Sequence, residues 1–329
     1  MASTFDQVIQ CHWGRYLEAL RDNDIDTPYD WFTHPKLVKE GDNEDKYPFS
    51  TGADPSTEHE AELKKPLTNL SLHTLYRVGP YREQDIAIVG RNPRYSLDEL
   101  RRDDLEGTPQ DEFGQLDSLN EQTATAIGRI TGPNWGGWLG GDAVNDGDSW
   151  SAYTGLLFEP LEEHGSIPVN NYDEKGDYFI PGGNELPPFL NEFYFTNLFK
   201  LPTPIGCGGA PLDDSADPFY SALLREEIEA SGVSVIFGLG GPVWEAFRDD
   251  AEYVSRAFSD FEHEPDNIDG TVTTVHGALY ELSDETYVVP LIHQSAPGES
   301  WRYSEYEDVE DRKWRLERSI AHLASMDVI

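Results

Sequence analysis

Three side chains with versatile hydrogen-bonding chemistry, Asn92, Asn197 and His293, lie at the ends of short apolar runs. An amide group carries both a donor and an acceptor, so it can pair with the polar edge of a ligand or hold a water molecule. A histidine at such a position can donate a hydrogen bond to an oxygen on which negative charge develops. Each residue also has a simpler structural interpretation, as a turn former, a buried amide or a packed imidazole. Their meaning depends on whether the fold brings them together.

The apolar runs themselves are four short segments that predict buried strands. Helical spacing of apolar residues separates or flanks them, and one helix carries a clear start at Asp217-Pro218 and a stop at Gly232. Strands alternating with helices are typical of an α/β fold with a parallel sheet covered on both faces. The predicted strands are residues 85–90, 193–199, 233–238 and 287–292, and the predicted helices are residues 4–22, 217–230 and 308–325, with a further helix around Trp244 and Phe247 and a short one near 97–103.

In such a fold the ligand site lies beyond the carboxyl ends of the strands. That rule selects four segments, residues 90–95, 196–204, 238–244 and 293–298. The third contains a glycine-rich turn similar to a dinucleotide fingerprint, but Val243 replaces the third glycine, which disfavours nicotinamide binding. The β-rich stretch 271–282 predicts an additional hairpin.

The charge of the chain is extreme, with 62 acidic and 24 basic residues and a formal net charge of -38. The 39 aromatic residues, 8 Trp, 16 Tyr and 15 Phe, argue against a disordered acidic chain. Two interpretations remain, a surface for cations or basic partners and an adaptation to molar salt, where charges are screened over about 3 Å. Acidic residues are spread along the whole chain and Lys is scarce, at 8 against 16 Arg, which favours a halophilic protein. In molar salt, only the charge near a site would oppose nucleic-acid binding.

The sequence predicts a cytoplasmic location without a membrane anchor. Its first residues carry neither a basic nor an apolar signal region, and no apolar run approaches the length of a membrane span. The two cysteines, Cys11 and Cys207, do not have a metal-binding spacing.

Taken in order, the strand-end motifs resemble those of the uracil-DNA glycosylase superfamily. Residues 85–95 are similar to its first motif, a strand ending in Gly-x-Asn-Pro, in the form found in the mismatch-specific and single-strand-selective branches. Residues 193–202 are similar to its second strand, in which Thr-Asn reads the base and is followed by Lys and Pro. Further resemblance covers residues 234–247, 274–277 and 288–302, which are similar to its third strand and following helix, the hairpin before the fourth strand, and its last motif.

The resemblance implies a three-layer α/β/α fold with a central four-stranded parallel sheet in the order 2-1-3-4. We expect a uracil-DNA glycosylase-like domain over residues 85–329, interrupted by a long loop-rich insertion at about 97–190. Residues 1–84 would then be an N-terminal helical extension that packs on this core.

The resemblance also assigns site residues. It implies catalytic roles for Asn92 and His293, and no metal or cofactor, since two cysteines cannot ligate the iron–sulfur cluster of some branches. The implied base-binding residues are Gly90, Pro93, Tyr95, Asn197 and Ser295, and the implied contacts to the nucleic-acid backbone are Arg91, Arg94, Lys200 and Arg302.

The chemistry of these residue types fits base excision. A flipped-out uracil presents an acceptor, a donor and an acceptor, which the amide of Asn197 can pair with. The expected partner is therefore DNA that contains uracil or a related lesion. The last motif departs from the family, with Gln294 in place of Pro and no bulky apolar wedge in residues 296–298. The alternative is a non-catalytic protein of the same fold that binds a nucleotide, nucleic acid or another protein.

Overall fold

The computed structural model describes 12 stretches of the chain, and all structural statements below concern these residues. They are residues 4–27, 30, 85–91, 94–95, 157, 159–165, 193–198, 203–204, 218–258, 270–282, 285–292 and 307–329. The chain divides into two compact units. The first contains Met1–Arg77, Asn92–Trp135 and Phe199–Asp217, and the second contains Val78–Arg91, Gly136–Leu198 and Pro218–Ile329.

The described part of the first unit consists of one helix and two short strands. Helix α1 (Thr4–Arg21) buries Leu17 and Leu20, as its apolar spacing predicts. Strands β2 (Arg94–Tyr95) and β4 (Thr203–Pro204) pair in parallel, with Arg94 opposite Thr203. Within the described ranges, no helix of the chain combines the length and the apolar character needed to cross a membrane.

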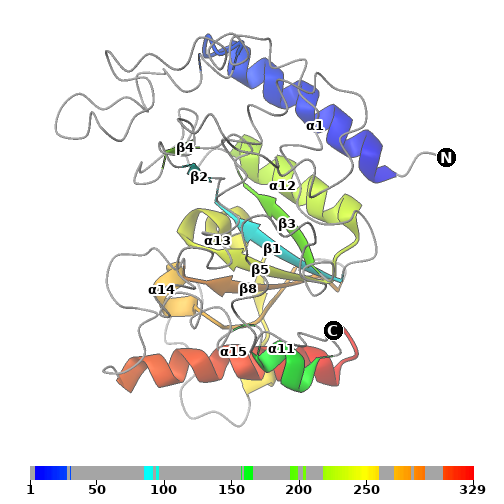
Figure 1. Cartoon of the computed structure of the whole chain (residues 1–329). Coiled ribbons are helices and arrows are strands. Elements are labelled where there is room, and N and C mark those ends of the chain that lie inside the picture. Colours follow the sequence, from blue (N-terminus) through cyan, green and yellow to red (C-terminus); the bar gives the residue numbers. More distant parts are fainter. Residues whose placement is uncertain are drawn as a thin grey trace, which may run out of the picture. The chain divides into compact units, whose positions relative to one another are not determined.

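The second unit is built on a six-stranded mixed sheet (Figure 1). Four neighbouring strands run parallel, and two short strands continue the sheet in antiparallel pairing beyond β8. In the order in which they pair, the strands are β3 (Phe193–Asn197), β1 (Ile86–Gly90), β5 (Val235–Leu239), β8 (Tyr287–Leu291), β7 (Tyr280–Glu281) and β6 (Glu252–Tyr253).

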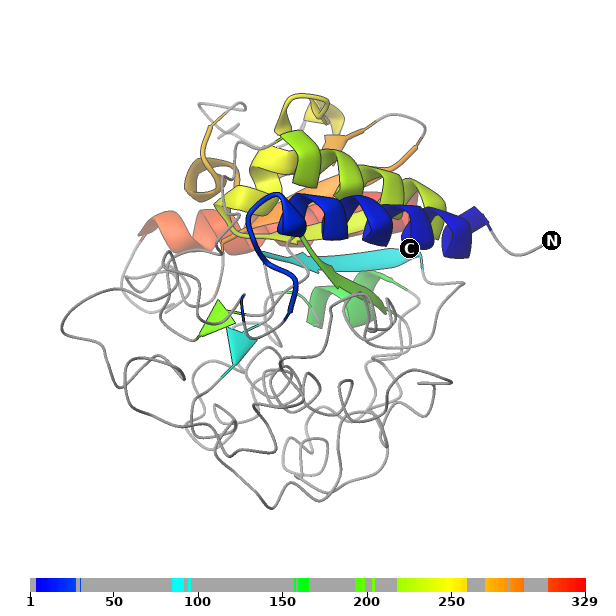
Figure 2. The same cartoon turned by 90° about the horizontal axis from the view of Figure 1, so that it is seen from above.

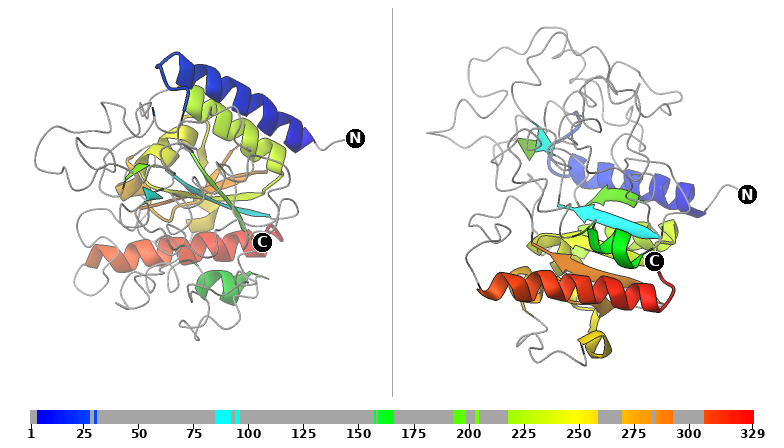
Figure 3. Two further views of the ribbon diagram at one scale, coloured as in Figure 1. Left: turned by 45° about the horizontal axis from the view of Figure 1, so that its top comes forward. Right: turned by 60° about the horizontal axis from the view of Figure 1, so that its bottom comes forward.

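Helices cover both faces of this sheet, so the second unit is an α/β structure. Helices α12 (Pro218–Ser231) and α13 (Gly241–Arg248) lie on one face, and α15 (Glu307–Ser325) and α11 (Glu159–His164) lie on the other (Figures 1 and 3). Every residue of β1, β5 and β8 is buried. Strands that are apolar along their whole length are expected where helices cover both faces of a parallel sheet.

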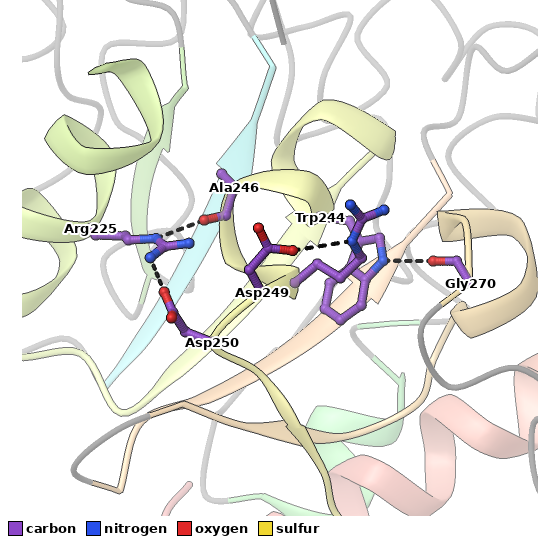
Figure 4. Close-up of polar contacts among 7 residues, drawn as sticks. Arg225, Trp244, Ala246, Asp249, Asp250 and Gly270 are labelled. Atoms are coloured by element: carbon purple, nitrogen blue, oxygen red, sulfur yellow. Dashed lines mark hydrogen bonds and ion pairs between the residues drawn. The ribbon is translucent and has the colours of Figure 1, made fainter. Parts of the chain in front are cut away.

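Two smaller elements complete the second unit. The 3₁₀ helix η5 (Ser255–Phe258) follows β6 and packs against α15, and the short helix α14 (Val272–Val275) packs against β8. Trp244 of α13 is buried and donates from Nε1 to the Gly270 carbonyl oxygen at 2.9 Å, which holds the approach to α14 against α13 (Figure 4).

The α/β class is confirmed, but the expected sheet of four strands is too small. The four predicted segments do form neighbouring parallel strands, and β6 and β7 extend them to six. The predicted hairpin at 271–282 is wrong in its first half, where the chain forms α14, and only β7 is a strand. The helix predicted at 308–325 is present as α15, and Gly232 follows α12 with a φ of 75°. The expected helix cap at Asp217 and the insertion at 97–190, apart from residues 157 and 159–165, lie outside the described residues.

Candidate functional site

The carboxyl ends of β1 and β3 lie side by side. The two strands run next to each other (Figure 2), and Gly90, the last residue of β1, pairs with Asn197, the last residue of β3. The Leu198 amide donates to the Gly90 carbonyl oxygen at 2.9 Å and continues the ladder one step further. The strands of the first two motifs therefore end at adjacent positions on one edge of the sheet.

Alternation along β3 determines where Asn197 points. Tyr194 and Thr196 are buried and both donate hydrogen bonds to Glu227 of α12. Successive side chains of a strand point to opposite faces. Asn197 is therefore directed away from α12, and it is half-buried with its Oδ1 atom enclosed.

The chain segments that follow β1 and β3 pair again as β2 and β4, where Tyr95 stands opposite Pro204. Asn92 and Pro93 lie between β1 and β2 in sequence, and residues 199–202 lie between β3 and β4. All of these intervening residues lie outside the described ranges.

The middle strand of this edge, β5, ends in a glycine corner. Gly240 has a φ of 91° and precedes α13, a conformation that favours glycine. Added to Gly238, a Cβ would lie 3.2 Å from Cγ1 of Val243, so this glycine allows the helix to approach the strand closely. Val243, which replaces the third glycine of a dinucleotide fingerprint, is fully buried at this contact.

Contacts at its far end hold α13 in place. Arg225 of α12 donates from Nε to the Ala246 carbonyl oxygen at 2.7 Å and forms an ion pair with Asp250 (Figure 4). Nε of Arg248 lies 3.6 Å from Oδ1 of Asp249, the next residue in the chain. The corner at Gly240 is therefore set between a buried strand and an anchored helix.

Hydrogen bonds to neighbouring segments hold the end of β8. Its last carbonyl, at Leu291, accepts from the Gly240 amide at 2.7 Å, and the Pro290 carbonyl accepts from the Gly277 amide at 2.8 Å. The next amide, of Ile292, donates to Nδ1 of the buried His276 at 2.9 Å. Since Nδ1 accepts this bond, the proton of the neutral imidazole is on Nε2. These contacts fix the chain immediately before His293.

Sequence reasoning missed His276 and Glu227 as members of the site's support. A signal for Glu227 was available, because it occupies the apolar face of α12 together with Leu223, Leu224 and Ile228. A charged residue type on the buried stripe of an amphipathic helix indicates a specific polar partner. His276 was noted only as part of a hairpin motif, and the motif gives no indication of its contact with Ile292.

The spacing of the strands sets the dimensions of this edge. Neighbouring strands are about 4.8 Å apart, so the ends of β1 and β8 are separated by about 10 Å, with β5 between them. The residues that follow β5 are Gly240 and Gly241, which bring no side chain to this interval.

Arg91 is the one predicted backbone-binding residue whose side chain the structure describes. It follows β1 directly and is half-buried, with its Nε atom enclosed. Burial lowers the pKa of its guanidinium below the ordinary value. The Arg91 side chain is thus partly enclosed by the protein and is not a freely exposed cation.

The predicted site residues fall into three groups. Gly90, Arg91 and Asn197 are described and lie together on the two neighbouring strand ends. Only the strand positions of Arg94 and Tyr95 are described, in β2. The residues outside the described ranges are Asn92, Pro93, Lys200, His293, Ser295 and Arg302.

Among the described residues, no three His, Cys, Asp or Glu side chains gather as they would around a metal ion. No protein-family model matches the chain, and no curated protein matches it. The interpretation of the site therefore rests on its own residues and their arrangement.

Proposed function

We propose that this protein is a DNA glycosylase of the uracil-DNA glycosylase superfamily that hydrolyses the N-glycosidic bond of uracil or a related damaged base. The observation that carries the proposal is the pairing of Gly90 with Asn197 at the carboxyl edge shared with the end of β8. Three motifs that are more than 90 residues apart in the sequence thereby end on one edge of one sheet.

The strand order supports the proposed family fold. Numbered along the chain, the four parallel strands β3, β1, β5 and β8 follow the order 2-1-3-4, which the family resemblance implies. In open α/β sheets, ligands bind beyond the carboxyl ends of strands where the strand order reverses. The order reverses at β1, and the motif Gly90-Arg91-Asn92-Pro93 follows that strand.

The proposed reaction begins with a base rotated out of the DNA stack. The amide of Asn197 donates to one carbonyl oxygen of uracil and accepts from its N3–H. Asn92 holds a water molecule whose oxygen forms a bond to C1′ as the bond from C1′ to N1 breaks. The electron pair of that bond leaves with the base, and His293 donates a hydrogen bond to the O2 atom, where negative charge accumulates. Since an amide cannot act as a general base, the water's proton passes to solvent and turnover is slow.

The DNA partner of an acidic protein requires a local explanation. In sequence, Arg91 and Arg94 follow the first strand, and Lys200 and Arg302 belong to or follow the second and the last motif. Molar salt screens the distant carboxylates, so only cations close to the bound DNA would set the charge that a phosphate group meets. The cytoplasm of a halophilic cell is the environment in which such a protein would bind DNA.

A second candidate function is binding without cleavage. Gln294 replaces a proline of the last motif, and Asn92 is not a carboxylate. Both departures affect the reaction and leave base recognition by Asn197 intact. In this alternative the same edge binds a nucleotide, nucleic acid or another protein.

Incubation with uracil-containing oligonucleotides in molar KCl, single-stranded and duplex, followed by alkaline cleavage, tests the proposal. We expect strand breaks only at uracil, with matched thymine oligonucleotides as the control. Equilibrium binding of the same oligonucleotides, measured in parallel, separates the two candidates. Tight uracil-dependent binding without breaks would favour the non-catalytic protein, and neither breaks nor binding would refute the glycosylase and the nucleic-acid-binding form of the alternative.

A further inference from the structure

A fully enclosed carboxyl group lies between α12 and β3. Glu227 has 0% of its surface exposed, and Tyr194 and Thr196 each have 2%. The Tyr194 hydroxyl donates to Oε1 of Glu227 at 2.5 Å, and the Thr196 hydroxyl donates to the same atom at 2.6 Å. Two donors from one strand thus converge on a single oxygen atom of the helix.

Stability alone does not explain this arrangement. Removing a carboxyl group from water is costly, and apolar residues of similar volume at such positions are often as stable or more stable. The neighbours Leu223, Leu224 and Ile228 show that α12 already presents an apolar face to the sheet. The polar cluster fixes the position of the strand relative to the helix. Its hydrogen bonds form in one relative position only, whereas apolar contacts tolerate sliding.

The hydrogen bonds to Glu227 position the end of β3. Tyr194 and Thr196 are alternate residues on one face, so the shared acceptor fixes the twist of the strand as well as its height along α12. Thr196 immediately precedes Asn197, which points to the other face. With the Leu198 amide bonded to Gly90 on one side and Thr196 bonded to Glu227 on the other, the peptide that carries Asn197 is held from two directions.

We propose that Glu227 is a positioning residue for Asn197, acting through Thr196 and supported by Tyr194. The inference rests on the proposed function in so far as Asn197 reads the base. Glu227 does not itself touch the base, since α12 lies behind β3 from the side on which Asn197 points.

The test compares four substitutions with a matched control on the same helix. Thr196→Val and Tyr194→Phe each remove one donor with little change of shape, Glu227→Gln keeps an acceptor oxygen, and Glu227→Met removes the acceptor. Glu229→Met, on the exposed side of α12, is the control. For every variant the melting temperature, the single-turnover excision rate over a range of uracil-oligonucleotide concentrations, and the NMR signals of the Asn197 side-chain amide are measured in molar KCl.

We expect Thr196→Val and Glu227→Met to slow excision about tenfold or more at saturating DNA and to shift or broaden the Asn197 side-chain signals. Thr196→Val should change the melting temperature little, whereas Glu227→Met removes the acceptor of two buried hydroxyls and should lower it. Glu227→Gln should behave between these variants and wild type. A lowered melting temperature with wild-type excision and unmoved Asn197 signals would make the cluster structural only and overturn the proposal.

The NMR signals keep the inference separate from the proposed function. If wild type excises no uracil but the Asn197 signals move in Thr196→Val and not in Glu229→Met, the positioning role stands and the glycosylase proposal fails. If wild type excises uracil and neither rate nor signals change in Thr196→Val, the positioning role fails alone. Should Glu227→Met not fold, Thr196→Val, which is smaller in effect on the core, decides the question.

Discussion

The polar residues buried near the strand ends differ in what they hold. Glu227 holds the side chains of a strand, whereas His276 holds a main-chain amide, that of Ile292, beyond the last residue of β8. A buried amide without an acceptor costs about 1–3 kcal/mol. His276 is therefore expected to contribute to the stability of the second unit as well as to the path of the chain toward His293.

Substitutions at His276 that move the acceptor test this role. In His276→Asn the amide group can present its oxygen close to the position of Nδ1, whereas His276→Gln carries it one bond further and His276→Leu has none. We expect Asn to retain most of the stability and Leu to lose about 1–3 kcal/mol. Urea unfolding in molar KCl measures the difference, and hydrogen exchange of the Ile292 amide should accelerate in Leu and Gln only. Equal stability of all three variants would contradict the assignment.

His293 has a different predicted role, since its hydrogen bond strengthens only as charge develops on the departing base. His293→Ala should then lower the single-turnover rate about 100- to 1000-fold with little effect on DNA binding. If His293 only packs the end of the fourth strand, the substitution should lower the melting temperature and leave excision unchanged. Measuring both quantities in high salt separates these outcomes.

At the residue scale, the sequence predicts which residue types stand at the strand ends but not how they are held. Asn197 was expected near the end of a strand over residues 193–199, and β3 ends at Asn197 itself, opposite Gly90. The contact of His276 with Ile292 joins residues 16 apart through a turn that contains Gly277 at a φ of 75°. Such a contact depends on tertiary geometry, which side-chain chemistry and spacing alone do not encode.

At the scale of elements, length decided what could be predicted. The four parallel strands contain five residues each and are apolar or buried enough to stand out, whereas β6 and β7 contain two residues each. Two residues cannot display the period-2 pattern that identifies a strand. The short helix α14 was mistaken for a strand because its residues, Val-Thr-Thr-Val, are β-branched and normally favour sheets.

Two helices end with an aspartate in the left-handed conformation that glycine usually adopts. Asp24 follows α1 with a φ of 60°, and Asp327 follows α15 with a φ of 64°. In both, the next amide reaches back to close the helix, from Ile25 to Leu20 at 3.0 Å and from Val328 to Leu323 at 3.1 Å. This is the Schellman pattern, in which a residue with a Cβ is strained.

Replacing Asp327 by glycine should therefore stabilise the protein by about 0.5–1 kcal/mol. Asp327→Asn removes the same charge but keeps a Cβ, so the backbone strain remains. It therefore serves as the control for electrostatics. Asp249→Gly provides the opposite case, because Asp249 ends α13 with an ordinary φ of -69° and should lose stability on the same change. Urea denaturation midpoints in molar KCl would refute the argument if both glycine variants moved in the same direction.

At the scale of the whole molecule, charge is the dominant property. A net charge of -38 in 329 residues produces self-repulsion that opposes the compact state in dilute buffer. The described ion pairs are few and largely exposed, such as Arg21 with Asp26 at 3.7 Å, so they offset little of this repulsion. Screening by salt is therefore expected to stabilise the fold.

We predict that the melting temperature rises steeply between low and molar KCl and that structure is partly lost in dilute buffer. Circular dichroism at increasing KCl concentration, with thermal unfolding at each step, measures this. A melting temperature that is independent of KCl would contradict the halophilic interpretation, and the acidity would then count against a DNA partner.

The division of the molecule into units was not anticipated in its detail. We expected a boundary near residue 84, but the first unit also takes in Asn92–Trp135 and Phe199–Asp217. Each of these stretches follows a strand of the sheet in sequence, β1 or β3. Composition along the sequence does not indicate that these separate chain segments belong to one unit.

The central claim is that the side-chain amide at the end of β3 reads the edge of an extruded uracil, and Asn197→Leu tests it most directly. Leucine has a similar size but neither donor nor acceptor, and Asn23→Leu, at an exposed asparagine after α1, is the matched control. Single-turnover excision of uracil from an oligonucleotide in molar KCl should fall about 100-fold or more in Asn197→Leu, because two hydrogen bonds are lost. It should be unchanged in Asn23→Leu. Excision by Asn197→Leu at the wild-type rate would contradict the account.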